Sequence, residues 1–225
     1  MLVEVKNLAK SFGDRELFSE LNFTFKPAEV NVILGESGSG KSTLLNIIGL
    51  FEDADDGEVL YDGNVVSSLP TAQRRKVIRE TTGYIYQDIR LFEELSVVEN
   101  IRLALRFSAE PRRDWNARSH ELLARLGMEE LTDKPAKLLS GGEKQRIAIA
   151  RALAANKKLI LADEPTGALD ELNSKVSIDL LQEACDQDRC TIVLVTHSQL
   201  VAHSFSNRRW LEHGQLLDRS EHREG

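Results

Sequence analysis

A glycine-rich segment between a strand-like run and a helix-forming run constrains the fold of this chain more than any other feature. The run Val30 to Leu34 predicts a buried strand, Gly35 to Gly40 a loop, and Lys41 to Leu50 a helix. Glycines let successive backbone N–H groups curl around phosphate oxygens, and the start of a helix adds positive partial charge. The order of these elements therefore predicts a phosphate-binding loop on an α/β fold.

The loop fits the Walker A pattern, in which a glycine and four further residues precede Gly-Lys-Ser. In this pattern Lys41 is expected to reach the β and γ phosphates, and Ser42 to place its hydroxyl on Mg²⁺. The residues predicted to bind the nucleotide here are Gly35, Ser37, Gly38, Ser39, Gly40, Lys41, Ser42 and Thr43. The loop alone indicates only nucleotide binding, because kinases, GTPases and many ATPases share it.

A second predicted strand, which ends in two acidic residues, indicates which reaction the bound nucleotide undergoes. The apolar run Leu159 to Ala162 ends in Asp163 and Glu164. Neighbouring residues on a strand point to opposite sides, so the two acids can have different roles. Asp163 fits the role of holding Mg²⁺, and Glu164 fits a general base that polarises the water attacking the γ-phosphate. An isolated Asp-Glu pair is typical of a solvated strand end, but the phosphate loop favours the catalytic interpretation.

The remaining pattern predicts a parallel sheet covered on both faces. The run Thr191 to Val195, like Leu159 to Ala162, lacks polar alternation, and a helix from about Glu171 to Asp186 separates the two. Other predicted elements are strands at Leu2–Val5, Leu21–Phe25, Gly57–Tyr61 and Tyr84–Tyr86, helices after Pro70 and at Glu143–Ala154, and a hairpin over Arg209–Leu217.

The middle of the chain predicts an inserted helical subdomain. Ser96-Val97-Val98-Glu99 has the form of a capping box and opens a helix that continues through Leu105. Asp114 is expected to cap a second helix, which stops at Gly127.

Composition sets wider limits. The chain has 225 residues and a net charge of −7, which argues against broad nucleic-acid binding. No apolar run approaches the roughly 20 residues that a spanning helix needs, and the amino terminus does not resemble a signal peptide. We therefore expect a cytosolic protein, in which Cys185 and Cys190 are reduced thiols rather than a disulfide or a metal site.

A further motif identifies the family that the chain resembles. The run Leu139 to Arg146, LSGGEKQR, resembles the signature motif of the ABC ATPases. Gln87 matches the glutamine loop of that family, Ala168-Leu169-Asp170 its D-loop, and His197 its switch histidine. The order of these motifs is also that of the family, and the match spans roughly residues 2 to 217.

The resemblance implies a fold class and a domain plan. The fold is an α/β P-loop NTPase (RecA-like) core with an antiparallel β subdomain and an inserted α-helical subdomain. Residues 1–225 form one ABC ATPase domain, with residues 1–87 and 157–225 as the catalytic core. Residues from about 88 to 156 form the helical subdomain, which carries the signature motif.

It also implies roles for single residues. Ser140, Gly141 and Gly142 would cap the γ-phosphate that the partner's Walker A loop holds, so that two chains sandwich two nucleotides. Gln87 would contact Mg²⁺ and the attacking water, and His197 would contact the γ-phosphate and that water.

Two further residues keep alternative interpretations. Asp170 would cross the dimer interface, and it also fits an N-cap before Glu171. Phe12 would stack on adenine, although a phenylalanine at a strand end also fits a place in the core.

The implied function is that of the ATP-binding and hydrolysing subunit of an ABC transporter, with ATP and Mg²⁺ as cofactors. It would pair with an identical or similar ATPase subunit and with an integral membrane permease, at the cytoplasmic face of the inner membrane, without binding nucleic acid. Ala162 to Asp170, ADEPTGALD, resembles the lipoprotein-releasing, macrolide-export and cell-division groups. That favours export or mechanical extraction of an envelope substrate. The alternatives are an importer ATPase and a soluble ABC ATPase without a transport role.

Overall fold

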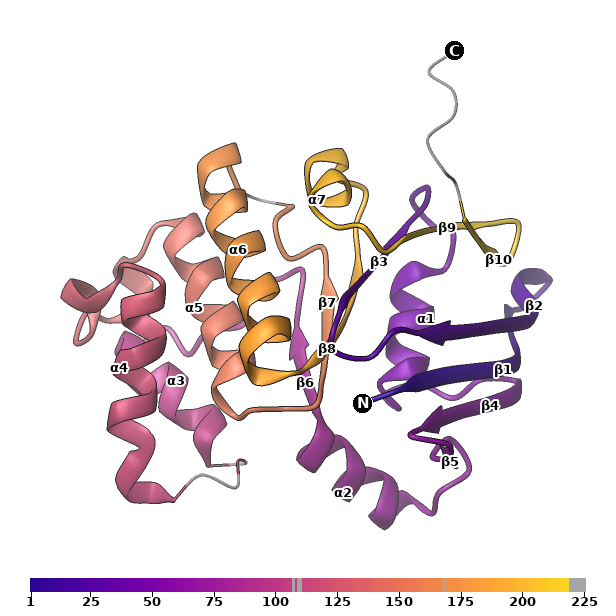
Figure 1. Ribbon diagram of the computed structural model, residues 1–225, viewed down its shortest axis with the longest axis horizontal. Coiled ribbons are helices and arrows are strands. Elements are labelled where there is room, and N and C mark those ends of the chain that lie inside the picture. Colours follow the sequence, from indigo (N-terminus) through magenta and orange to yellow (C-terminus); the bar gives the residue numbers. More distant parts are fainter. Residues whose placement is uncertain (107, 109–110, 168, 219–225) are drawn as a thin grey trace.

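The structure is a computed structural model that describes residues 1–106, 108, 111–167 and 169–218. Two sheets organise this part of the chain, one of six strands and one of four (Figure 1). The strands are β1 Val3–Phe12, β2 Arg15–Phe25, β3 Val30–Leu34, β4 Asp56–Tyr61, β5 Asn64–Val65, β6 Thr82–Ile85, β7 Leu159–Asp163, β8 Thr191–Val195, β9 Arg208–Glu212 and β10 Gln215–Leu217.

The larger sheet has the order β10-β9-β3-β8-β7-β6. Its strands from β9 to β6 pair in parallel, and β10 closes one edge as an antiparallel hairpin with β9. Side chains alternate between its two faces: Ile160 and Ile192 belong to one buried cluster, whereas Leu161 and Val193 belong to another. Because both faces are buried, these strands show no polar alternation, as the sequence predicted.

Helices cover the two faces of this sheet unequally. They are α1 Lys41–Ile48, α2 Thr71–Thr81, α3 Val97–Leu105, α4 Trp115–Arg125, α5 Gly141–Ala154, α6 Glu171–Asp188 and α7 Gln199–Ser204, with short 3₁₀ turns at Arg112–Asp114, Glu129–Leu131 and Ala136–Leu138. Buried side chains of α3 to α7 share one cluster with the sheet. Helix α1 packs on the opposite face, together with the antiparallel sheet (Figure 1).

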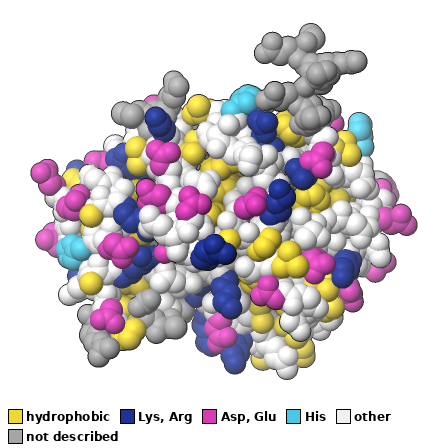
Figure 2. Space-filling model, viewed as in Figure 1, with side chains coloured by type: hydrophobic (Ala, Val, Ile, Leu, Met, Phe, Trp, Pro, Cys, Tyr) yellow, Lys and Arg dark blue, Asp and Glu magenta, His cyan; other side chains and the backbone are white. Residues whose placement is uncertain are grey.

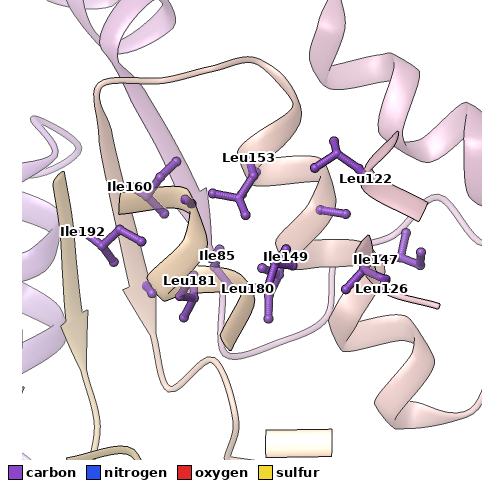
Figure 3. Close-up of a cluster of buried hydrophobic side chains, with 14 of the residues drawn as sticks. Ile85, Leu122, Leu126, Ile147, Ile149, Leu153, Ile160, Leu180, Leu181 and Ile192 are labelled. Carbon is purple, nitrogen blue, oxygen red and sulfur yellow. The ribbon is translucent and has the colours of Figure 1, made fainter. Parts of the chain in front are cut away.

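Figure 3 shows part of the cluster that the sheet shares with α5 and α6. Ile160 and Ile192 of the sheet lie opposite Ile149 and Leu153 of α5 and Leu181 of α6, and all five are at most 3% exposed. Burying a side chain of this size stabilises a fold by about 1.5–3 kcal/mol. The cluster therefore fixes the position of α5, whose first residues carry the signature motif.

The smaller sheet is antiparallel, with the order β2-β1-β4-β5. Its strand β1 runs from Val3 to Phe12, well beyond the predicted Leu2–Val5. Register shifts interrupt its pairing with β2 after Val5, and Asn7 adopts a positive φ of 49°. These bulges break the two-residue alternation, which is why the sequence pattern revealed only the first half of the strand.

Most other predicted elements are present, with shifted ends. Strands β3 and β8 have the predicted bounds, and the predicted capping box of Ser96 begins α3. Helix α7 was not predicted. Asp114 precedes α4, but its side chain does not cap that helix, because its own backbone is already helical in the preceding turn. Cys185 and Cys190 are buried free thiols, as expected.

Charged side chains of both signs lie on the surface of the molecule. Figure 2 shows Lys and Arg side chains interspersed with Asp and Glu over the face that it presents. None of the helices in the described ranges combines the length and apolar character needed to cross a membrane.

Candidate nucleotide-binding site

The phosphate loop joins the end of β3 to the start of α1. The Lys41 side chain folds back over it, and Nζ donates to the carbonyl oxygens of Gly35 and Glu36 at 2.8 Å each. Burial lowers the pKa of Lys41, while the nearby carboxylates of Glu164 and Asp163 oppose this shift. The loop thus holds the Lys41 ammonium group near Asp163 and Glu164, the two acids predicted from the sequence to take part in the reaction.

Two glycines of this loop are required by its geometry. Gly40 precedes the first residue of α1 with φ 98°, a conformation that L side chains rarely adopt. A Cβ at Gly35 would lie 2.7 Å from the carbonyl oxygen of Leu211 in β9. Ser37 and Gly38 are exposed in the turn, whereas Ser39 and Thr43 are half-buried. The loop therefore presents its backbone to solvent at the edge where the parallel strands end.

The end of β7 brings an acid to this loop. Ser42 Oγ donates to Asp163 Oδ1 at 3.1 Å, although the two residues are 121 positions apart in the chain. Burial raises the pKa of Asp163, and the Glu164 carboxylate raises it further, whereas the Ser42 hydroxyl and Lys41 lower it. A hydroxyl and a carboxylate at this distance provide the hard oxygen ligands that Mg²⁺ prefers, so the residues present fit that ion.

Mg²⁺ generally takes few protein ligands and completes its shell with phosphate oxygens and water. Within the described ranges, no three or more His, Cys, Asp or Glu side chains are grouped so that they could hold a metal ion. Of the three residues predicted to bind the metal, Ser42 and Asp163 lie within hydrogen-bond distance of one another.

Glu164 lies at the centre of a second polar cluster. Its Oε2 accepts a hydrogen bond from Thr196 Oγ1 at 2.7 Å, and its Oε1 lies 2.7 Å from His197 Nδ1. Its backbone N–H donates to the carbonyl of Val195 at 2.9 Å, and its φ is 46°, in the left-handed region. The side chain of Glu164 is 9% exposed, whereas that of His197 is 71% exposed. The carboxylate is thus fixed from both sides at the rim of the site.

Thr196 was not selected from the sequence. The sequence feature that could have identified it is its position as a polar residue directly after the run Thr191 to Val195. Thr196 is fully buried in the structure. A buried hydroxyl needs a partner, and Glu164 is that partner. Side-chain pairing across two strand ends cannot be seen in a linear pattern.

Gln87 lies exposed in the bend just after β6. Strand β6 pairs in parallel with β7, and Ile85 is opposite Ala162. This register places Gln87 at the same edge of the sheet as Asp163 and Glu164.

The signature motif forms the start of α5. Ser140 is its N-cap: its Oγ accepts from the N–H of Glu143, and the Glu143 carboxylate accepts from the Ser140 N–H. Ser140 and Gly141 are exposed, and Gly142 packs against Asn173 of α6, where a Cβ would lie 3.1 Å from the amide. The exposed helix start offers free N–H groups for an anion.

Helix α5, which begins with the signature motif, also contacts the segment directly after β7. Gln145 Nε2 donates to the carbonyl of Pro165 at 2.7 Å, one residue after Glu164. Gln145 is buried, and no local pattern in the sequence indicated this contact. The start of α5 therefore lies near the carboxyl end of β7, on the face of the sheet opposite α1.

Asp170 is the N-cap of α6. Its Oδ1 accepts from the N–H of Asn173 at 2.8 Å, as the N-cap interpretation predicted. The Asn173 amide in turn accepts from Arg146 Nη1 of α5 at 2.8 Å, so the D-loop and the signature helix are linked. Ala168 of the predicted D-loop lies outside the described residues.

Phe12 is not a core residue. Its side chain is 54% exposed at the tip of the β1–β2 hairpin, which excludes the core alternative. The Lys10 ammonium lies 5.2 Å from its ring centroid, and Arg15 of the same hairpin reaches the phosphate loop, where Nη2 donates to the Gly38 carbonyl.

Comparison with known proteins agrees with this geometry. The family model described as ABC transporter matches residues 18–167. The macrolide export ATP-binding/permease protein MacB of Pasteurella multocida is 36% identical over 221 residues, covering 96% of this chain but only 34% of MacB. The chain therefore spans about a third of the length of that relative.

Two other proteins match along nearly their whole length. The lipoprotein-releasing system ATP-binding protein LolD 2 of Caulobacter vibrioides is 39% identical over 205 residues, covering 91% of this chain and 90% of LolD 2. The ATP-binding cassette MJ0796 of Methanocaldococcus jannaschii has been solved as a dimer in a post-hydrolysis state bound to ADP and Pi. Its structure superposes with a TM-score of 0.85 at 34% identity, covering 99% of this chain and 100% of that one.

The superposition confirms the predicted P-loop core with its antiparallel and helical additions. The phosphate loop and the paired acids lie together at one edge of that core, and Gln145 of the signature motif contacts Pro165 at the same edge. On the family match and the identity over nearly all of its length, the chain belongs to the ABC transporter family as an ATP-binding and ATP-hydrolysing cassette.

Proposed function

We propose that this chain supplies the energy for a membrane transporter by hydrolysing ATP·Mg²⁺ as one half of an ATPase pair. The observation that carries the proposal is the cluster at the end of β7 and β8. There Asp163 bonds to the phosphate-loop Ser42, and Glu164 is held by Thr196 and His197.

Glu164 is the general base in this proposal. It polarises a water molecule that attacks the γ-phosphorus; the new bond joins that water oxygen to phosphorus, and the bond to the β-phosphate bridging oxygen breaks. The hydrogen bond from Thr196 and the contact with His197 fix the carboxylate before the substrate arrives. His197, 71% exposed, extends beyond Glu164 to contact the γ-phosphate and the water. A positioned base of this kind contributes about 10²–10⁴ in rate.

The phosphate loop and the metal ligands orient the triphosphate. Lys41 exchanges its bonds to the carbonyls of Gly35 and Glu36 for bonds to the β and γ phosphates. Ser42 and Asp163 would hold Mg²⁺, with Gln87 beside them. When bound, the ion would neutralise charge on the phosphate oxygens. Phe12 stacks on adenine from the hairpin tip.

The positions of α1 and α5 support a two-chain site. Both helices start at the carboxyl edge of the parallel sheet, but they pack on opposite faces of it. The anion site of Ser140, Gly141 and Gly142 therefore lies across the sheet from the chain's own phosphate loop. In a pair of chains it caps the γ-phosphate bound to the other one, and Asp170 lies at the boundary between them. The second chain is an identical copy or a similar ATPase.

We propose the domain plan that the sequence predicts, with residues 1–87 and 157–225 as the catalytic core and residues from about 88 to 156 as a helical subdomain. Residues 107, 109–110, 168 and 219–225 of these ranges lie outside the described residues. Helices α3, α4 and α5 pack against one another in support of this division. The Gln87 loop joins the two parts, and an integral membrane permease seated beside it would receive the closing motion.

The transport direction rests on relatives. MacB is named for macrolide export and LolD 2 for lipoprotein release. The sequence from Ala162 to Asp170 resembles the corresponding segment of those groups. We therefore favour export or mechanical extraction of an envelope substrate, at the cytoplasmic face of the inner membrane. An importer ATPase and a soluble ABC ATPase without a transport role are the alternatives.

Two substitutions test the catalytic proposal. Glu164→Gln should abolish steady-state ATP turnover and leave ATP binding intact, and retained turnover would refute the base assignment. Ser140→Arg should abolish turnover by filling the anion site of the partner's nucleotide, and retained turnover would refute the two-chain site. Ser96→Arg, at the equivalent cap of α3, is the matched control and should keep turnover.

A separate experiment tests the transport role. The chain is extracted from native membranes in mild detergent and the proteins that copurify are identified. A multi-pass membrane protein with a large extracytoplasmic domain would support export. Copurification of a soluble protein alone would contradict the transporter role and leave the ATPase assignment standing.

A further inference from the structure

The tip of the β1–β2 hairpin touches the phosphate loop through Arg15. This residue begins β2 and pairs with Phe12, the last residue of β1. Its Nη2 donates to the carbonyl oxygen of Gly38 at 2.6 Å, across 23 positions of the chain. A Cβ at Gly38 would lie 3.3 Å from the same guanidinium, so the arginine lies directly against the loop.

A neighbouring apolar contact supports the hydrogen bond. Leu17, two residues further along β2, lies against the start of α1, where a Cβ at Gly40 would be 3.3 Å from its Cδ1. The hairpin therefore meets the phosphate loop through one polar and one apolar contact. Together they set the position of the hairpin tip relative to the loop.

The other side of the hairpin tip is also fixed. Lys10 lies over the ring of Phe12, and its ammonium donates to the carbonyl of Asp53 at 2.8 Å and forms an ion pair with Asp55 at 3.3 Å. Phe12 itself stays 54% exposed. The structure thus holds an exposed aromatic ring at a set distance from the phosphate loop.

We propose that Arg15 is a positioning residue that ties the base-stacking ring of Phe12 to the phosphate loop. The inference rests on the proposed stacking of adenine on Phe12. One nucleotide must meet both the ring and the loop, and a hairpin fixed in advance saves the ordering cost of bringing them together on binding. Arg15 therefore acts on affinity for ligands that contain the base, and not on affinity for the phosphates alone.

A comparison of two ligands tests this role. ADP carries the base, inorganic pyrophosphate lacks it, and the chain hydrolyses neither in the proposed reaction. Binding of each, with Mg²⁺, is measured by calorimetry for the unaltered chain, Arg15→Ala, Phe12→Ala and the double variant. Lys6→Ala is the matched control, since it removes a cation from β1 whose recorded contact is an ion pair with Glu4.

We expect Arg15→Ala to weaken ADP binding about three- to tenfold, the range of the net contribution of one ordinary hydrogen bond. Pyrophosphate binding should change by less than about twofold. In the Phe12→Ala background, Arg15→Ala should have no further effect on ADP binding, because the ring through which it acts is gone. Lys6→Ala should bind both ligands like the unaltered chain.

Other results would overturn the inference. An equal loss of pyrophosphate affinity would mean that Arg15 contacts phosphate or shapes the loop itself. Unchanged ADP binding in Arg15→Ala, with a loss in Phe12→Ala, would refute the positioning role and leave adenine stacking intact. Unchanged ADP binding in Phe12→Ala would refute the stacking proposal and this inference together. Melting temperatures check folding, and Arg15→Gln, which keeps a donor, separates loss of the hydrogen bond from loss of the fold.

Discussion

Two serines at the starts of two helices offer a test that separates stability from catalysis. Ser96 caps α3 and Ser140 caps α5, each in a capping box of nearly the same geometry. In both, the serine Oγ accepts from the N–H three residues later at 3.3 Å. The glutamate at that position accepts from the serine N–H at 2.8 Å in α3 and 2.7 Å in α5.

The similar geometry predicts a similar stability effect, with Ser96 Oγ also donating to Glu99 Oε2 at 2.9 Å. Replacing an N-cap serine with alanine costs about 1 kcal/mol of unfolding free energy, because one N–H of the first turn loses its acceptor. For a chain of this size, 1 kcal/mol lowers the melting temperature by about 2–4 °C. Ser96→Ala and Ser140→Ala should therefore melt within about a degree or two of each other.

Turnover should differ between the two variants. Ser140 is proposed to donate its hydroxyl to the γ-phosphate held by the second chain, whereas Ser96 is placed only at a structural helix start. A hydrogen bond to a charged group is worth about 1.5–3 kcal/mol, so Ser140→Ala should lower steady-state ATPase activity about tenfold or more. Ser96→Ala should keep the turnover of the unaltered chain at temperatures well below melting.

The comparison can fail in two ways. If Ser96→Ala lowers turnover as far as Ser140→Ala, the loss reports weakened packing of the helices and not a lost phosphate contact. If Ser140→Ala melts as predicted but keeps full turnover, Ser140 is only a helix cap. Either result would remove the support for a nucleotide shared between two chains.

Three further predictions concern the pH dependence of stability, the packing of the core and the orientation of Glu164. Bonds from backbone N–H groups lower the pKa of Glu99 and Glu143, and a lowered folded pKa gives stability that is complete above the unfolded pKa and lost as the pH falls through the folded one. The free energy of unfolding, measured with urea, should therefore decrease below about pH 5, and it should decrease less steeply in Glu99→Ala. Ile147→Ala, at a fully buried position, should cost about 2–5 kcal/mol in urea unfolding, and a cost below about 1 would contradict the packing. Thr196→Val removes the donor to Glu164 and should lower ATPase activity about tenfold or more with ADP binding unchanged, whereas unaltered turnover would refute the orienting role.

Local patterns in the sequence were enough to predict the parts that depend on neighbouring residues. Gly35 to Ser42 formed a phosphate loop because backbone curvature and helix start are set by residues next to one another. Ser96 and Ser140 capped their helices because a capping box spans only four positions. Strands β3 and β8 were predicted with correct bounds, because burial on both faces leaves an unbroken apolar run.

The sequence pattern was weaker where tertiary contacts override local alternation. It missed α7 and half of β1, where bulges interrupt the two-residue period. It left Phe12 open between core and surface, and the structure placed it on the surface. Exposure depends on which elements cover a residue, and that is decided by the packing of the whole chain.

The sequence by itself determined which chemical groups this protein carries, and the tertiary structure decided which of them meet. Thr196 and Glu164 are 32 positions apart, and Arg15 and Gly38 are 23 apart, so no local pattern pairs them. Parallel pairing brings the carboxyl ends of β7 and β8 side by side, and hairpin packing brings Arg15 to the loop. Hydrogen bonds act over about 3 Å, so only the folded chain brings these groups into range.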